Sequence, residues 1–222
     1  MTVKKILVYP NDKLKKVSNK SELNVDSLKN TVKDLLDTIR HYEGNKFLTS
    51  TQIGAEENLA VFDLQMIYAK EFKNNERFLI IVNPEIIDKS KETITFQETS
   101  GSTPFFQCTS TKNKSIKVKF NSLKLNLKEE NESELENKNE NDVSIIKGLN
   151  INDFTFEEQI VTFWDEMSIT MQSAIDQLNG KCFLDHLSWF NRSRYMKKYK
   201  NQINSFKKLI KQNMLQNFNG LK

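Results

Sequence analysis

The sequence is poor in the residues that build small cross-linked or metal-bound modules. Its 222 residues include two cysteines, two histidines, three prolines and six glycines. Two cysteines without a pairing pattern exclude a disulfide scaffold and a cysteine-based zinc module. No stretch approaches the roughly 18 consecutive apolar residues that a membrane helix needs. We therefore expect a soluble protein with no membrane span, folded around one core of ordinary size.

The charge of the chain is divided unevenly along its length. The formal net charge is only +4, but residues 186–222 contain nine basic residues and no acidic one. The preceding 185 residues therefore carry a net charge of −5. We divide the chain into a main domain, residues 1–190, and a basic C-terminal helix, residues 191–222.

An acidic segment interrupts the main domain. Residues 128–142 read KEENESELENKNEND, with seven acids, two lysines and one apolar residue. Such a composition cannot bury enough apolar surface to fold by itself. The sequence predicts an acidic low-complexity insertion in a loop over residues 121–150.

Apolar spacing predicts helices and antiparallel strands in the rest of the chain. A first helix begins at Asp26 and Ser27, which we interpret as its cap, and a long helix runs from Thr155 to a stop at Gly180. A basic helix follows over residues 191–217. Four short runs suit strands: residues 59–64, 78–82, 93–97 and 116–120. Asn83 and Pro84 are expected to close the second run. This order favours an α+β fold.

The residues themselves offer little catalytic chemistry. His41 and His186 have no cysteine or carboxylate at metal-ligand spacing, so no zinc motif is present. The sequence also lacks a glycine-rich phosphate loop and a nucleophile elbow. Ser100 has no histidine or lysine near it in the sequence to act as a base. By this criterion alone, the chain is a binding protein or a scaffold.

Three segments change this interpretation. They read QSAIDQLNG at residues 172–180, followed by FLDHLS; FQETSGSTP at residues 96–104; and LTSTQIG at residues 48–54. The first resembles the Q-H-E-x-D-H-L-x-G motif of peptide deformylases, the second their E-G-C-L-S motif and the third the end of G-x-G-L-A-A-x-Q. The similarity spans nearly the whole chain in the correct order. It implies a deformylase-like fold, with antiparallel sheets around a central helix and a basic C-terminal helix.

The resemblance also shows which family residues are missing. In deformylases one cysteine and two histidines hold a divalent metal, and a glutamate acts as general base. The cysteine corresponds to Ser100, the histidines to Ser173 and Gln177, and the glutamate to Ala174. Hydroxyls and an amide are weak ligands for Zn²⁺ or Fe²⁺. We therefore expect no bound metal, no cofactor and no catalytic residue at these positions.

The remaining family positions are partly retained. Gln52 corresponds to the glutamine that helps to bind the developing oxyanion, and we expect it to be a hydrogen-bonding core residue here. Gly101 follows the cysteine position. Asn45 and Phe47 stand where the family has glycines, and Phe47 is expected to hinder the close approach of a peptide backbone.

The basic helix is the predicted binding element. In bacterial deformylases a cationic C-terminal helix docks on the ribosome, and the candidate RNA-binding residues here are Arg192, Arg194, Lys197, Lys198, Lys200, Lys207, Lys208 and Lys211. A solvated lysine-rich helix that covers its own core is the alternative.

The leading hypothesis is therefore a non-catalytic, deformylase-like component of a large assembly, with ribosomal RNA or protein as partner and no DNA. A mitochondrial or other organellar matrix is the expected compartment, with the bacterial cytoplasm as the alternative. Two other functions stay open: a deformylase with residual or altered activity, and a protein that binds formyl peptides or nascent chains without cleaving them.

Overall fold

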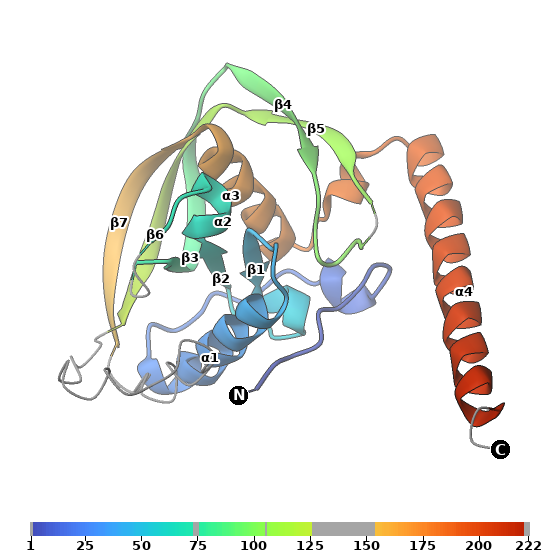
Figure 1. Ribbon diagram of the computed structural model, residues 1–222. Coiled ribbons are helices and arrows are strands. Elements are labelled where there is room, and N and C mark those ends of the chain that lie inside the picture. Colours follow the sequence, from blue (N-terminus) through green and yellow to red (C-terminus); the bar gives the residue numbers. More distant parts are fainter. Residues whose placement is uncertain (1, 73–75, 105, 126–153, 220–222) are drawn as a thin grey trace.

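The computed structural model describes residues 2–72, 76–104, 106–125 and 154–219 (Figure 1). The helices in these ranges are α1 (Val25–His41), α2 (Leu64–Tyr68), α3 (Asp165–Leu178) and α4 (Trp189–Asn219). The strands are β1 (Phe47–Thr49), β2 (Leu59–Asp63), β3 (Phe78–Lys89), β4 (Thr93–Glu98), β5 (Cys108–Asn113), β6 (Ser115–Leu125) and β7 (Phe154–Trp164). Among the described residues, no helix combines the length and hydropathy that a membrane span requires.

The strands form two antiparallel sheets. The larger has the order β1-β2-β3-β6-β7, so that β1 lies at one edge, and the smaller pairs β4 with β5. In Figure 1 the β4–β5 hairpin rises over the larger sheet and bends back toward α4. The predicted α+β fold with antiparallel sheets and a C-terminal helix is confirmed.

The larger sheet lies between two helices. Because side chains alternate along a strand, neighbours such as Val61 and Phe62 on β2 face opposite sides. Val61 joins a buried cluster with Leu35 and other residues of α1. Phe62 joins a second cluster with Met171 and the apolar face of α3. The predicted central helix is therefore α3, covered on one side by the sheet.

The long helix predicted from Thr155 is wrong in its first part. Residues Phe154–Trp164 form β7, which pairs with β6 along its whole length. Ile160 and Trp164, expected in a buried stripe, are 54% and 59% exposed. The segment is rich in aromatic and β-branched residues, which suit a strand. Gly180 lies just beyond α3 with φ of +70°, as its predicted role at the helix end requires.

Several predicted boundaries also move. The side chain of Asn24, not Asp26 or Ser27, caps α1 by accepting a hydrogen bond from the Asp26 amide at 2.9 Å. Asn83 and Pro84 do not end their strand; β3 continues through them with an irregular register. Asn83 has φ of +53°. Its side-chain amide accepts a hydrogen bond from the Ser21 N–H and donates one to the Ser21 carbonyl.

The predicted insertion begins too early. Residues 121–125 continue β6 and pair with the start of β7, because Leu123 is buried against Phe154 in the α1-side cluster. The rest of the predicted acidic insertion, residues 126–150, lies outside the described residues.

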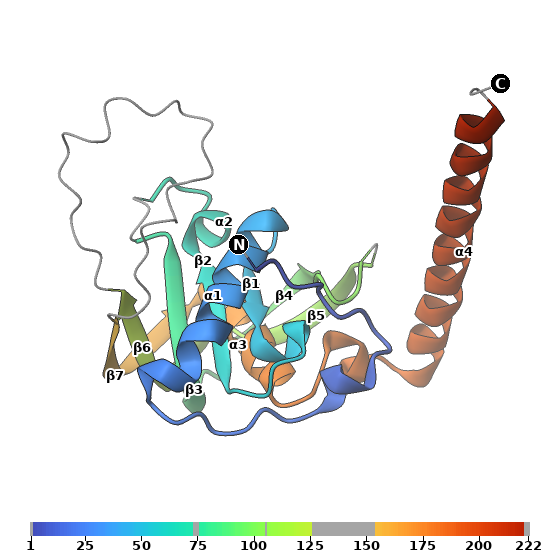
Figure 2. The same ribbon diagram turned by 90° about the horizontal axis from the view of Figure 1, so that it is seen from below.

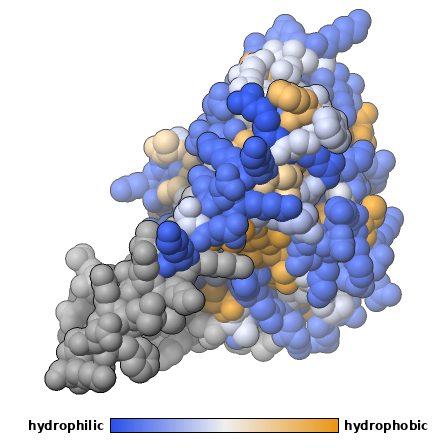
Figure 3. Space-filling view, turned by 90° about the vertical axis from the view of Figure 1, so that its right-hand side faces the viewer, coloured by the Kyte–Doolittle hydropathy of each residue, from blue (hydrophilic) through white to orange (hydrophobic). Residues whose placement is uncertain are grey.

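Helix α4 is anchored by its first turns. Tyr195 and Tyr199 are buried in a third cluster with Tyr9, Leu14 and Phe183. Figures 1 and 2 show the helix beside the domain, with its C-terminal end extending away from it. The predicted helix over residues 191–217 is confirmed, with two more residues at each end. Seen from the side on which α4 lies, the surface is mostly hydrophilic with scattered apolar residues (Figure 3).

Candidate functional site

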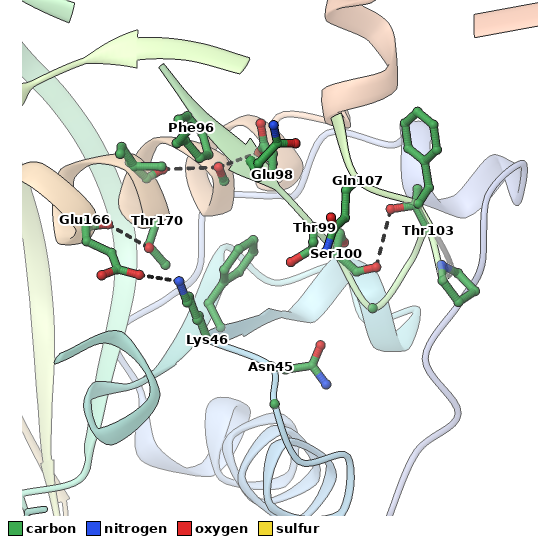
Figure 4. Close-up of a pocket in the computed structure, with 18 of the residues that line it drawn as sticks. Asn45, Lys46, Phe96, Glu98, Thr99, Ser100, Thr103, Gln107, Glu166 and Thr170 are labelled. Atoms are coloured by element: carbon green, nitrogen blue, oxygen red, sulfur yellow. Dashed lines mark hydrogen bonds and ion pairs between the residues drawn. The ribbon is translucent and has the colours of Figure 1, made fainter. Parts of the chain in front are cut away.

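A cleft of about 980 Å³ brings two of the three motif segments, those of Glu98 and Ser173, together with the residues that precede the third (Figure 4). One wall is the chain leading into β1, a second is β4 with the loop that follows it, and a third is α3. Helix α4 contributes Lys198. The polar and charged residues named in the argument below line this cleft: Asn45, Lys46, Glu98, Ser100, Gly101, Glu166, Ser173 and Lys198.

Ser173 stands at the centre of a buried polar network. Its Oγ donates a hydrogen bond to Glu98 Oε1 at 2.6 Å and accepts one from Lys112 Nζ at 2.7 Å. The side chains of Lys112 and Glu98 are 9% and 7% exposed. Lys112 Nζ lies 3.4 Å from Glu98 Oε1 and 3.3 Å from Asp176 Oδ2. Two carboxylates thus surround one ammonium, and the three groups together carry one negative charge.

Ser100 lies two residues after Glu98, in the loop that follows β4. It is half-buried in a tight turn, where its Oγ accepts the Ser102 amide at 3.2 Å and its carbonyl accepts the Thr103 amide at 2.9 Å. Both local contacts hold the turn that follows β4. Ser100 and Ser173 therefore both line the cleft, as the motif resemblance implies.

Gln177 and Ala174 do not line the cleft. Gln177 is 4% exposed, and its backbone carbonyl accepts a hydrogen bond from Thr51 Oγ1 at 3.3 Å. Ala174 is fully buried in the cluster between α3 and the sheet. The i and i+4 spacing of Ser173 and Gln177 is kept, but only Ser173 reaches the open space.

These residues do not fit the divalent metal of deformylases. Two hydroxyls and an amide are neutral and weakly basic, whereas the metal prefers a thiolate and imidazoles. Within the described ranges, no group of three or more His, Cys, Asp or Glu residues could hold a metal ion. No step of the chemistry below is therefore assigned to such a metal.

Gln52 ties β1 to the loop after β4. It is 1% exposed; its Oε1 accepts the Thr49 amide at 2.9 Å, and its Nε2 donates to Ser102 Oγ at 3.2 Å. It does not line the cleft. These contacts agree with the expected role as a hydrogen-bonding core residue.

An ion pair closes the opposite end of the cleft from the Ser100 loop. Lys46 pairs with Glu166 at the first turn of α3, as Figure 4 shows. Phe47, which follows Lys46, is half-buried and packs on Phe62 with a ring-centroid distance of 6.1 Å. Phe47 also lines the cleft. That it hinders a peptide backbone stays a prediction.

The basic residues of α4 differ in their surroundings. Arg192 anchors the helix: it pairs with Asp185 at 3.2 Å and donates to the Tyr9 hydroxyl, which raises the pKa of its guanidinium. Arg194, Lys197, Lys198, Lys200 and Lys208 are exposed. The side chains of Lys207 and Lys211 lie outside the described residues. RNA binding by this set stays a prediction, with Arg192 mainly a structural residue.

Sequence reasoning missed Lys112. It stands on β5 in the polar run CTSTKN, which matches none of the family motifs. The pairing of β4 with β5 places Lys112 opposite Ile94, four residues from Glu98 along β4. The side chain of Lys112 spans this distance to Glu98 and also reaches Asp176 on α3. Only the three-dimensional structure brings these charges together.

Comparisons with known proteins give a consistent result. A peptide deformylase of Buchnera aphidicola subsp. Schizaphis graminum is 29% identical over 198 residues, covering 89% of this chain and 95% of the relative. A peptide deformylase of Rickettsia canadensis is 28% identical over 206 residues, covering 91% and 99%. A solved peptide deformylase from Legionella pneumophila shares the fold, with a TM-score of 0.67 at 24% identity and coverage of 93% and 96%.

These relatives correct the leading hypothesis from the sequence. A non-catalytic component of a ribosome was expected, but the similar proteins that align along most of the chain are named peptide deformylases. This finding favours the deformylase alternative. The leading hypothesis rested on the missing metal ligands and did not include Lys112, which lies beside Ser173 and Glu98.

The family itself is shown by a separate comparison. A family model described as polypeptide deformylase matches residues 3–138, which is more than half of the chain. The matched region contains the Gln52 and Glu98 motifs, and the Glu98 segment lines the cleft together with Ser173 of the motif on α3. This chain belongs to the polypeptide deformylase family.

Proposed function

We propose that the chain is a peptide deformylase with altered chemistry, which removes the formyl group from the N-terminus of a peptide held in the cleft. One observation carries the proposal: the Glu98 and Ser173 motif segments line one cleft with the chain leading into β1, the edge strand of a sheet. The names of the relatives support the same activity.

The edge strand offers a way to hold a peptide backbone. β1 is the outer strand of the larger sheet, and Asn45, Lys46 and Phe47 at its start line the cleft. An extended peptide can add to such an edge through main-chain hydrogen bonds. The peptide would then run along β1 with its N-terminal end directed to the polar groups of Ser100 and Ser173.

The cleft also offers apolar surface for a side chain. Phe96, Ile94 and Ile169 line it together with Phe106. A methionine side chain is flexible and packs well against such mixed aliphatic and aromatic surface. A formyl-methionyl peptide therefore matches the cleft in both its polar end and its first side chain.

Turnover of a defined substrate tests this proposal. The full chain is incubated with a formyl-methionyl tripeptide, and formate release is measured beside that from the acetylated tripeptide. We expect formate from the first peptide and no acetate from the second. Absence of formate would contradict the proposal. The second candidate function is a protein that binds formyl peptides without cleaving them, because the residues at the metal position are poor ligands. Saturable binding of the formyl peptide without formate release would favour this candidate.

The partner and compartment belong to the same proposal. The relatives named above come from bacteria, so the bacterial cytoplasm is the proposed compartment. Ribosomal RNA or protein is the proposed partner of the exposed basic residues on α4. Co-sedimentation with ribosomes should fall steeply as salt rises. The double variant Lys197→Glu, Lys200→Glu is compared with the unaltered chain. If both sediment equally with ribosomes, α4 is not the binding element.

A further inference from the structure

The hydrogen bonds around Ser173 fix the direction of its hydroxyl proton. The Lys112 ammonium can only donate, so in its 2.7 Å contact the Ser173 oxygen is the acceptor. The hydroxyl proton must then point to another acceptor. Glu98 Oε1 lies at 2.6 Å, closer than the Ile169 carbonyl at 3.1 Å. The Ser173 proton is thus directed at a carboxylate.

We propose that Ser173 is a nucleophile and Glu98 its general base, forming a formyl-transfer pair in place of the family metal. This inference rests on the proposed function, because it assigns the residues that would perform formyl removal. A serine within hydrogen-bond reach of a base, which is in turn held by a third group, is the arrangement of an activated nucleophile. Lys112 is the third group.

The surroundings of Glu98 favour this role. The residue is 6% exposed, and its second oxygen, Oε2, has no hydrogen-bond partner among the described residues. Glu98 and Ser173 both line the cleft, so a formyl group can approach them from the open side (Figure 4). A buried carboxylate with one oxygen on the nucleophile and one oxygen unpaired can take up a proton during the reaction.

Lys112 is a positioning residue in this scheme. Its ammonium contacts Ser173 Oγ and lies within ion-pair distance of Glu98 and Asp176. These contacts hold the Glu98 side chain in place beside Ser173. Because the ammonium lies beside the attacking oxygen, it would also stabilise negative charge that develops on the tetrahedral intermediate.

The reaction balances without a further reactant except water. Ser173 Oγ forms a bond to the formyl carbon, and its proton moves to Glu98. The C–N bond then breaks, and Glu98 gives that proton to the departing amine, leaving a formyl ester on Ser173. Water attacks the ester while Glu98 takes one of its protons. The C–O bond to Ser173 breaks, the proton on Glu98 returns to Ser173, and formic acid leaves and gives its proton to the solvent to become formate.

The test compares variants of the full chain in the presence of EDTA. Formate release from a formyl-methionyl tripeptide is measured for the unaltered chain, Ser173→Ala and Glu98→Gln. Ser168→Ala is the matched control, because Ser168 is also buried on α3 and hydrogen-bonded to the Asn113 carbonyl at 3.0 Å but does not line the cleft. Circular dichroism and thermal unfolding check that each variant folds.

The expected result is formate release that EDTA does not reduce. Ser173→Ala should lose it entirely, Glu98→Gln should lose at least about 10²-fold, and Ser168→Ala should keep it. Persistence in Ser173→Ala, or loss in the unaltered chain on adding EDTA, would overturn the inference and leave the proposed function standing. No formate from the unaltered chain without EDTA would overturn both.

A second pair of variants separates positioning from folding. Lys112→Arg retains a positive charge with several donors, whereas Lys112→Met retains the length without the charge. We expect Lys112→Arg to keep part of the kcat of the unaltered chain. Lys112→Met should lose kcat, with KM little changed. Equal kcat in Lys112→Met and the unaltered chain would overturn the role assigned to Lys112.

Discussion

The side chain of Asn45 occupies the space beside Gly101. A Cβ at Gly101 would lie 2.9 Å from Asn45 Oδ1 and 3.3 Å from Ile6 Cδ1. The family motifs have glycine at the Asn45 position and leucine at the Gly101 position. Relative to the family motifs, the side chain at position 45 is therefore larger and the one at position 101 is smaller. The loop after β4 still approaches the chain leading into β1 closely.

This exchange predicts coupling between the two positions. Gly101→Leu should lower the free energy of unfolding by about 1–3 kcal/mol through overpacking. Asn45→Gly should relieve part of that cost when combined with Gly101→Leu, although alone it loses the 2.7 Å hydrogen bond to the Tyr42 carbonyl. Urea unfolding of both single variants and the double variant measures the coupling. Additive effects would contradict it.

Gly180 is predicted to tolerate no side chain. Its φ is +70°, and a Cβ would lie 2.3 Å from the Lys15 carbonyl oxygen. Gly180→Ala should therefore lower the free energy of unfolding by more than about 1 kcal/mol through backbone strain. Overpacking should lower it by about 1–3 kcal/mol more. Gly44→Ala is the control, because Gly44 has φ of +88° and open space around it. Equal melting temperatures for the two variants would contradict the steric explanation.

Removing the Lys112 charge should destabilise the fold. Glu98 would remain buried without its ammonium, and loss of one partner of a buried pair costs about 3–5 kcal/mol. The neighbouring Lys114 forms an exposed pair with Glu92 at 3.1 Å. Water screens such a surface pair, so its loss should have little effect on stability. Lys112→Met should therefore unfold at clearly lower urea than Lys114→Met. Similar midpoints would show that the buried network adds little stability.

Cys182 is predicted to be unreactive in the folded protein. Burial raises the pKa of its thiol to about 12, and the nearby Asp185 carboxylate adds to the shift. Because the thiolate is the nucleophile, the thiol at pH 8 should react slowly with iodoacetamide. Peptide mapping compares the alkylation rate of Cys182 in native and urea-unfolded protein. Equal rates would contradict the burial of this side chain.

The sequence predicted the fold class because the apolar spacing of α1 and α4 is regular and the family motifs keep their order. It failed at β7, where the same apolar residues suit either a helix or a strand and pairing with β6 decides. It failed likewise at Asn83, where a positive φ bends β3 without ending it.

The site was only partly predictable. The motifs placed Ser100 and Ser173 in one cleft, but their spacing gave no signal for Lys112 on β5. Ser173 was interpreted only as a lost metal ligand, because a serine shows its chemistry only when its partners are known. Glu98 and Lys112 reach it through sheet pairing and helix packing, which a single sequence does not encode locally.

The most direct test of the account is the number of formate molecules released per chain with EDTA present. A formyl-methionyl tripeptide is supplied in large excess over purified full-length protein, and Ser173→Ala is measured beside it. The account predicts many formate molecules per unaltered chain and none above background for the variant. Equal release from both, or none from the unaltered chain, would contradict it.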